Sequence, residues 1–269
     1  MHNRYNEIEY AKAIESNGFL SRFKKHELRV LAKYYKSQGV KNAELKELIC
    51  EFCERHIPNY NEVRYASFIN GIINFASKKT NKLIVIKDIP IAGTEGRAID
   101  KLDIGYEYKR FLFAWLVKVK LNRAIYKISH DAELKSIYFS HEVARQKEIF
   151  KMSNLDRKEY NMNEIIKHLY DKGIIDIANN GKIKLLFMEN MTEGKKISLR
   201  IPTTDIDYAG YYWDQFKKKY KVGYCQECGI IIKKKNISKK YCQKCGKKIK
   251  NLQTNQSKKA KRQKEKNMG

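Results

Sequence analysis

Apolar side chains recur at helical spacing through the first third of the chain. The period runs through four successive segments, "EIEYAKAIES", "SRFKKHELRVLAKYYKSQG", "KNAELKELICEFCERHIPNY" and "EVRYASFINGIINFASKK". Ser21 is a candidate N-cap for the second segment and Gly39 a stop, while Pro58 ends the third. "KLIVIKDIPI" then breaks the period, because its alternation and β-branched residues are typical of a strand or an extended linker. The pattern predicts a helical domain over residues 1–90.

The middle of the chain predicts a long buried helix followed by a helix, a turn, a helix and a hairpin. "FLFAWLVKVKL" is the buried helix, and two amphipathic segments at 140–152 and 157–171 follow it, joined by the polar turn "SNLD". The strands "IIDI" and "KIKLLF" flank Asn180 and Gly181, a residue pair preferred in two-residue hairpin turns. In this order of elements, residues 91–205 resemble a winged helix-turn-helix domain, with the hairpin as its wing.

That resemblance implies a DNA-binding surface. In winged helices of this kind the N-terminal part of the second helix enters the major groove. Arginine can bond guanine there and asparagine can bond adenine. Winged helices also serve as scaffolds for protein interaction, and a helix face rich in Asn and Lys can simply be solvated. The candidate contacts are Arg157, Lys158, Asn161, Asn163 and Lys167.

The segments after the hairpin are a strand, an aromatic connector and a basic end. Residues 196–201 predict one more strand, and residues 206–222 form a connector rich in tyrosine and lysine. The aromatic side chains either stack on bases or, as we favour, pack the connector onto the winged-helix-like domain. Residues 251–269 have almost no apolar content and predict a basic tail that is disordered or becomes helical on binding. The predicted fold class is mainly α with small β elements.

The charge of the chain indicates what kind of partner it could bind. The 269 residues carry a formal net charge of +26. From residue 217 onward the chain has 19 Lys or Arg residues against two acids, Glu227 and Glu265. Such a field attracts polyanions, although lysine-rich ends can also act only as solubilising tails. No apolar run is long enough to cross a bilayer, so we expect no membrane association and a cytoplasmic location.

Four cysteines inside the basic region have the spacing of metal ligands. Cys225, Cys228, Cys242 and Cys245 read as C-x2-C-x13-C-x2-C, in which each pair can present two thiolates from one tight turn, a zinc knuckle. A glycine follows each pair, at Gly229 and Gly246, where we expect positive φ. Residues 223–250 thus resemble a zinc ribbon, and we predict one structural Zn²⁺. Four thiolates leave no open coordination position for catalysis.

Two other chemistries for these cysteines have less support. Disulfides need an oxidising compartment, and the chain opens on "MHNRYNEIEYAKAIES", which has no apolar signal segment. A redox CxxC motif usually starts a helix in a βαβ setting, which the pattern lacks. Cys50, Cys53 and His56 also share one side of a predicted helix. We interpret them as core-filling residues on an apolar face, with a second metal site as the alternative.

The whole order of segments resembles uncharacterised proteins of phages and other mobile elements of low-GC Gram-positive bacteria. The resemblance implies a role in the DNA metabolism or regulation of such an element. No P-loop, HExxH or GxSxG motif is present, and the histidines are scattered, so we expect no enzymatic activity.

We therefore predict a zinc-containing nucleic-acid-binding protein, with DNA favoured over RNA, that acts as a regulator or replication accessory. The alternatives are an RNA-binding or ribosome-associated protein, and an adaptor whose ribbon docks on a protein partner such as RNA polymerase. The basic candidates near and after the cysteines are Lys233, Lys234, Lys235, Lys239, Lys240, Lys258, Lys259, Lys261 and Arg262.

Overall fold

Four helices form the N-terminal domain of the computed structural model, which describes residues 3–132, 138–139, 143–178, 182–188, 196–234 and 238–266. Asn6 and Asn61 cap two of the helices, each accepting a hydrogen bond from a backbone N–H of the first turn. Ser21 does not cap the second helix, which begins at Lys24, because its Oγ accepts from the backbone N–H of Phe23 instead. The helices are α1 (Glu7–Asn17), α2 (Lys24–Ser37), α3 (Asn42–His56) and α4 (Glu62–Ala76).

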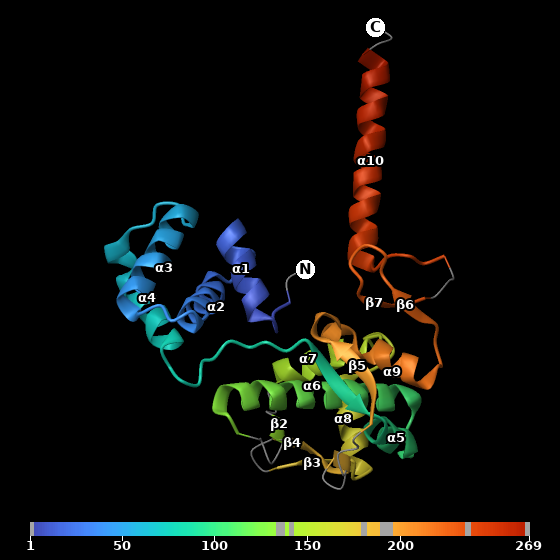
Figure 1. Cartoon of the computed structure of the whole chain (residues 1–269). Coiled ribbons are helices and arrows are strands. Elements are labelled where there is room, and N and C mark those ends of the chain that lie inside the picture. The colour runs from blue at the N-terminus through green and yellow to red at the C-terminus, as the bar shows by residue number, and fades with distance from the viewer. Residues whose placement is uncertain are drawn as a thin grey trace.

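An extended stretch leads from α4 to β1 (Asp88–Ala92), as Figure 1 shows. β1 pairs antiparallel with β5 (Ile197–Pro202), so the "DIPI" strand belongs to the central domain. The chain start also joins the two domains, since Tyr5 lies in the central core and its carbonyl accepts from Ile86 N at 2.8 Å. Glu7 forms a buried ion pair with Lys33 at this junction. The first domain is thereby tied to the second from both of its ends.

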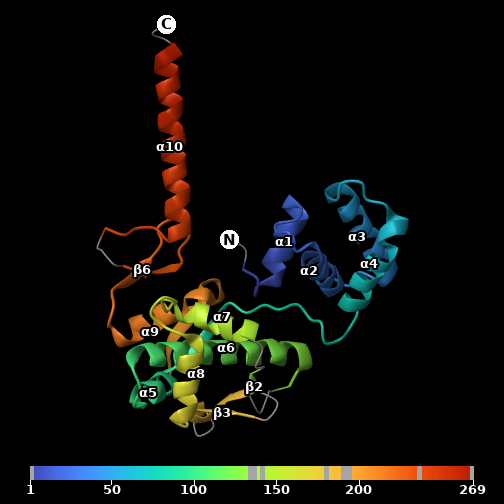
Figure 2. The ribbon, with the colours of Figure 1, turned by 180° about the vertical axis from the view of Figure 1, so that it is seen from behind.

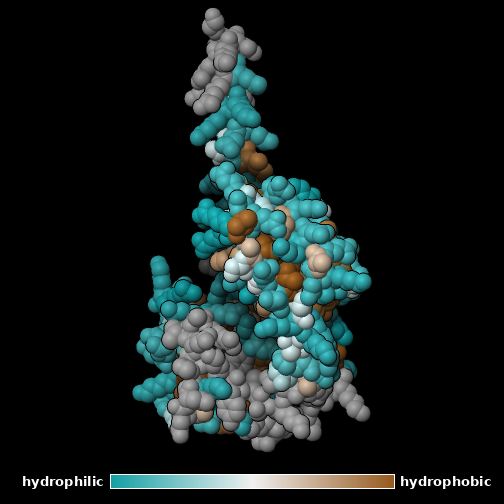
Figure 3. Space-filling view, turned by 90° about the vertical axis from the view of Figure 1, so that its left-hand side faces the viewer, coloured by the Kyte–Doolittle hydropathy of each residue, from teal (hydrophilic) through white to brown (hydrophobic). Residues whose placement is uncertain are grey.

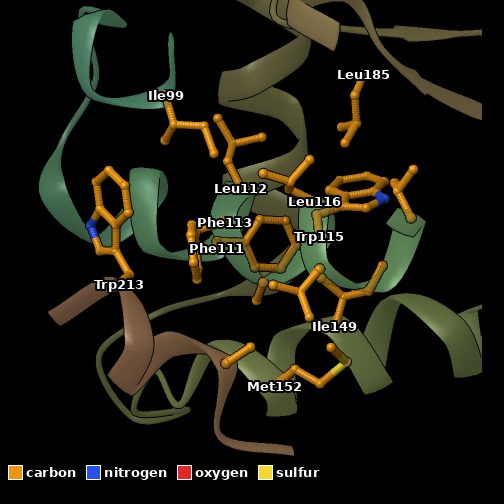
Figure 4. Close-up of a cluster of buried hydrophobic side chains, with 14 of the residues drawn as sticks. Ile99, Phe111, Leu112, Phe113, Trp115, Leu116, Ile149, Met152, Leu185 and Trp213 are labelled. Carbon is orange, nitrogen blue, oxygen red and sulfur yellow. The ribbon is translucent and has the colours of Figure 1, made fainter. Parts of the chain in front are cut away.

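The central domain is built around α6 (Tyr106–His130), whose first half is buried on all sides. Every residue from Phe111 to Val117 has a relative exposure of 0%. A helix that is apolar all round must be enclosed, and here the neighbouring elements add Ile99, Ile149 and Trp213 to the same buried cluster (Figure 4). The buried helix predicted from "FLFAWLVKVKL" is confirmed. The surrounding helices are α5 (Gly93–Lys101), α7 (Val143–Ser153), α8 (Met162–Asp171) and α9 (Ala209–Lys217).

A small three-stranded sheet accompanies α6, α7 and α8. Its strands are β2 (Tyr138–Phe139), β3 (Ile175–Ile177) and β4 (Ile183–Leu185), in the spatial order β2-β4-β3 and antiparallel throughout. The hairpin strands pair as the sequence predicts, while Asn180 and Gly181 lie outside the described residues. The second helix is shorter than expected, because residues 157–159 form a turn and α8 begins only at Met162.

The aromatic connector packs inward, which confirms the interpretation favoured from the sequence. Tyr212 and Trp213 on α9 are buried in the central core, and the Trp213 ring centroid lies 5.4 Å from that of Phe113. The buried carboxylate of Asp205 accepts from the Tyr212 hydroxyl at 2.7 Å and from the backbone N–H of Ile231 at 3.1 Å. Asp205 therefore fastens the next segment of the chain to the central domain.

The C-terminal segment differs most from the expectation. After β6 (Val222–Tyr224) and β7 (Ile231–Lys233), a single helix α10 runs from Gln243 to Lys266. The sequence predicted a tail from residue 251 that is disordered or becomes helical on binding. In the structure these residues continue the helix, since no proline or glycine interrupts residues 247–266 and most are good helix formers. α10 projects away from both domains (Figures 1 and 2). Among the described residues, no helix combines the length and the apolar content needed to cross a membrane.

The close approach of α9 to α7 predicts a strong effect of one added methyl group. A Cβ on Gly210 would lie 1.9 Å from the carbonyl oxygen of Ser153, a backbone atom that cannot rotate away. We expect Gly210→Ala to destabilise the protein by about 1–3 kcal/mol or more. Gly71→Ala is the control, because a Cβ there meets nothing within 4 Å and alanine favours helix α4 by up to about 1 kcal/mol. Thermal denaturation of both variants measures the difference, and equal midpoints would contradict the close packing.

Candidate metal centre

The four cysteines of the C-terminal segment converge on one point. Their sulfur atoms all lie within 4.8 Å of one another, and the Sγ atoms of Cys228 and Cys242 are 3.9 Å apart. Four thiolates at the corners of a tetrahedron with metal–sulfur bonds of about 2.3 Å would be separated by roughly 3.8 Å. The described residues contain this one group of three or more metal-binding side chains with such spacing. The predicted four-cysteine site is therefore confirmed as a cluster that could hold a metal ion.

The first cysteine pair lies in the turn between β6 and β7. Cys225 N donates to the carbonyl of Ile230 at 2.8 Å, and Gly229 N donates back to the carbonyl of Cys225 at 2.9 Å. Gly229 has a φ of 71°, the left-handed conformation that a side chain would strain. This pair therefore forms the knuckle that the spacing predicts.

The second pair is supplied by a helix, where the sequence predicted a second knuckle. Cys242 directly precedes α10 and Cys245 lies in its first turn. The Cys242 sulfur accepts from Cys245 N at 3.3 Å, the bond that an N-cap side chain makes to a helix. Gly246 is a helical residue and has no positive φ. The expected ribbon with two equivalent knuckles is thus wrong in its second half, and the metal site is joined directly to α10.

Backbone N–H groups favour ionised sulfur at one corner of the cluster. Cys242 N donates to the sulfur of Cys225 at 3.3 Å. Burial opposes ionisation of Cys225, but hydrogen bonds from backbone N–H groups, that of Cys242 first, outweigh it and lower the pKa of the thiol to about 6. Burial raises the pKa of Cys245 to about 12, and hydrogen bonds with the neighbouring thiols add to the rise. Such a cluster holds one thiolate readily and needs a cation to hold four.

A small apolar core surrounds the cysteines and connects them to the central domain. Ile230 and Ile232 are buried with Cys225, Cys242 and Cys245. Ile231, between the two isoleucines, points the other way and belongs to the core of the central domain with 0% exposure. Cys228 is the exposed corner of the cluster. The C-terminal unit is therefore docked on the central domain through β7.

The N-terminal cysteines have the surroundings of core residues. Cys53 is fully buried among the helices α2, α3 and α4, and Cys50 packs against the same core. His56 lies over the ring of Phe52, with 4.6 Å between the ring centroids. Burial raises the pKa of the Cys53 thiol to about 12, which makes it a poor nucleophile.

The candidate DNA contacts near α8 are divided between a turn and a helix. Arg157 and Lys158 are exposed in the turn before α8. Asn161 is the N-cap of α8, and its side-chain oxygen accepts from Asn163 N at 2.9 Å. Its amide is thus partly engaged in starting the helix. Asn163 and Lys167 are exposed one turn apart on α8, and the same exposed face carries two acids, Glu164 and Asp171.

The basic candidates of the C-terminal segment have several environments. Lys233 lies on β7 with its Nζ 3.5 Å from the centroid of the Tyr220 ring, and Lys234 is half-buried just after it. Lys239 and Lys240 are exposed before Cys242, and Lys239 Nζ donates to the carbonyl of Lys233 at 3.2 Å. Lys258 and Lys259 are exposed on α10. Lys261 and Arg262 also belong to α10, but their side chains lie outside the description, as does Lys235 entirely.

A pocket of about 370 Å³ separates the α8 region from β7. Tyr160 and Tyr220 line it, and so does Arg110, which is buried against Asp214. Three acids also line it, Glu107, Asp156 and Glu159, together with Lys233 of β7, so the pocket has a mixed charge.

The sequence interpretation overlooked several residues at the base of α10. Lys244, Lys247 and Lys248 are exposed there and follow the helical period that also includes Lys258 and Lys259. The helical spacing of these lysines can be recognised in the sequence only when residues 243–266 form one helix, and not when a tail begins at residue 251.

Comparisons with known proteins yield no relative for this chain. No protein-family model matches it, and neither the curated proteins nor the solved structures contain a match.

Proposed function

We propose that this protein binds duplex DNA through a basic helix oriented by a structural zinc site. The observation that carries the proposal is α10, a helix of 24 residues with ten lysine or arginine residues and one glutamate, attached directly to the four-cysteine cluster. At 1.5 Å per residue it is about 36 Å long. A helix this polar and this exposed gains little stability from packing against the rest of the chain. Contacts with a polyanionic partner would supply the missing stabilisation.

Zinc is the proposed metal because of the donor set and its surroundings. Four thiolates in a tetrahedral arrangement suit Zn²⁺ or iron–sulfur chemistry. Three of the four cysteines are buried, and all four are needed to complete the tetrahedron, so no position is free for a substrate. A zinc ion here would hold the β6–β7 turn against the first turn of α10 and so set the direction of the helix.

We also propose that α6, β2, α7, α8, β3 and β4 form a winged helix-turn-helix. Their order along the chain and the sheet order β2-β4-β3 support this assignment. The acids on the exposed face of α8 weaken its case as the principal DNA contact. In this proposal the unit carries the C-terminal segment and adds phosphate contacts from Arg157 and Lys158.

The test is a salt titration of binding to duplex DNA by the full-length, zinc-loaded chain. Log K should fall with log salt by about 0.9 for each phosphate neutralised. Four lysine-to-alanine changes on α10 should reduce that slope by about 3 to 4 and weaken binding to all sequences together. Four exposed lysines of the N-terminal domain, changed in the same way, provide a control with an equal loss of charge. The α10 set is Lys247, Lys248, Lys258 and Lys259, and the control set is Lys12, Lys25, Lys78 and Lys79.

Equal losses in the two variants would show that only total charge matters and would contradict the proposal. Stronger competition by structured or single-stranded RNA would favour the RNA-binding alternative. The proposed setting, regulation or replication of a phage or mobile element, is tested by sequencing the nucleic acid that copurifies with the intact protein before any high-salt wash.

A further inference from the structure

The lysines of α10 are not spread evenly around the helix. Lys244, Lys247, Lys248, Lys258 and Lys259 recur at intervals of three, four, ten and eleven residues, so they lie on one face. All five side chains are exposed. The face thus has two lysine clusters, one near the metal site and one toward the end of the chain.

Two asparagines occupy the gap between these clusters on the same face. Asn251 and Asn255 are four residues apart, three residues beyond Lys248 and three residues before Lys258 respectively. Both side chains are exposed, and within the described part of the chain neither amide has a hydrogen-bond partner. By contrast, the hydroxyls of Thr254 and Ser257 are already engaged with backbone carbonyls of the helix.

The opposite face of α10 lacks this arrangement. Ile249, Gln253 and Gln256 lie there by helical spacing, and the two lysines on that side, Lys250 and Lys264, are 14 residues apart. Leu252 lies at the edge of the lysine face, one turn after Lys248. Leu252 is 53% exposed, and with one neighbouring isoleucine it is too small an apolar surface for a zipper between two strongly basic helices. In the view of Figure 3 the part of α10 that is drawn in colour is mostly hydrophilic, with a small hydrophobic spot.

The dimensions of the basic face match the major groove of B-form DNA. From Lys247 to Lys258 the helix rises about 16 Å, which brackets a groove about 12 Å wide once the lysine side chains extend to the phosphates. A helix 10–12 Å in diameter enters that groove, whereas the minor groove is only about 6 Å wide. The deep, narrow major groove of duplex RNA excludes it.

From this geometry we infer that α10 is a base-reading helix, in which Asn251 and Asn255 contact adenines in the major groove while the two lysine clusters hold the flanking phosphates. The inference rests on the proposed duplex-DNA binding and assigns sequence recognition within it. Asparagine pairs bidentately with N6 and N7 of adenine, and no protein group competes for these two amides. The cap from Cys242 and the shared metal site fix the start of α10, which keeps both amides in register with the groove.

The experiment selects preferred sites from a random duplex pool with the full-length, zinc-loaded protein and then measures binding to them. We expect adenine-containing sites, with discrimination of about 5- to 150-fold for each bidentate contact. Asn251→Ala combined with Asn255→Ala should abolish that preference while the salt slope changes by no more than about one. Loss of helix cannot explain the result, because alanine is a better helix former than asparagine. Gln253→Ala with Gln256→Ala removes two amides from the opposite face and should leave the preference intact.

A chemical variant of the DNA identifies the groove. Replacing the selected adenines with 7-deazaadenine removes the N7 acceptor from the major groove and keeps pairing with thymine. Binding of the wild-type protein should weaken by at least about 5-fold, and binding of the asparagine variant should not change.

The possible failures separate the two proposals. Salt-sensitive binding with no sequence preference, or a preference that survives Asn251→Ala and Asn255→Ala, overturns base reading by α10 and leaves duplex-DNA binding in place. An absence of salt-sensitive duplex binding, or stronger binding to an RNA hairpin, overturns the proposed function and the inference with it.

Discussion

Changing Cys242 to serine is expected to release the metal and unfold the C-terminal unit. Cys242 contributes one sulfur to the cluster and also caps α10, accepting a hydrogen bond from Cys245 N. Metal binding in small four-ligand sites is worth on the order of 10 kcal/mol, and the core beside this site is small. Even changes outside the ligands weaken metal binding by about 10- to 100-fold, so loss of a ligand should cost at least about 100-fold.

Metal analysis and chelator competition measure this effect, with about one zinc per chain expected in the wild-type protein. Cys50→Ser is the matched control, because Cys50 is a half-buried cysteine of the N-terminal domain outside the cluster. The control should keep its metal. Wild-type protein that stays metal-free with a folded segment from Cys225 to Cys245 would contradict the zinc assignment.

The second large effect is a loss of stability, expected when the buried ion pair between Arg110 and Asp214 of the central domain is broken. Asp214 has a side-chain exposure of 0% and Arg110 of 6%, and Asp214 Oδ2 lies 3.4 Å from Arg110 Nη2. Tyr106 donates its hydroxyl to Asp214 Oδ1 at 2.8 Å. Burial raises the pKa of Asp214 above its usual value even though Arg110 opposes the rise, so this pair is held at a desolvation cost.

Asp214→Ala leaves Arg110 charged and unpaired inside the protein, at an expected cost of about 3–5 kcal/mol. Such a loss corresponds to a fall in Tm of roughly 6–20 °C. Asp88→Ala is the control, because it breaks the exposed pair with Arg200, for which the expected loss is under about 1 kcal/mol.

If the single variant does not fold, a double change keeps the prediction testable. Arg110→Met with Asp214→Leu replaces both charges by apolar groups and should be more stable than Asp214→Ala alone. Thermal denaturation of all variants compares them. A double variant less stable than the single one would mean that packing by Arg110, and not its charge, dominates.

Local patterns in the sequence determined most of the elements. The helical period predicted α1 to α4 and the buried half of α6, because burial on one face or all faces repeats with the geometry of the helix itself. The hairpin strands β3 and β4 followed from alternation. The two CxxC pairs predicted the cluster, since two residues between thiolates suit a single ion wherever the pairs meet.

The tertiary structure decided how these parts are used. The segment after Cys242 could turn as a second knuckle or begin a helix. It begins a helix because Cys245 N donates a hydrogen bond to the Cys242 sulfur and because Cys245 packs in the small core around the cluster. Neither contact produces a repeating pattern in the sequence. The start of α8 likewise depended on the cap made by Asn161. Ile231 joins the central core where Asp205, 26 residues earlier, accepts a hydrogen bond from its backbone, a contact that local sequence does not encode.

In the C-terminal segment, the sequence sets the net charge, whereas the tertiary structure sets where the charged side chains lie. Composition alone established that this end of the chain is strongly basic, because charge adds up regardless of conformation. One continuous helix was needed to bring Lys248, Asn251, Asn255 and Lys258 onto one face, since residues three and four apart are neighbours only in that conformation. The sequence by itself thus determined the local elements, the four cysteines of the cluster and the sign of the charge at this end of the chain, while long-range contacts decided where helices begin and which surfaces are formed.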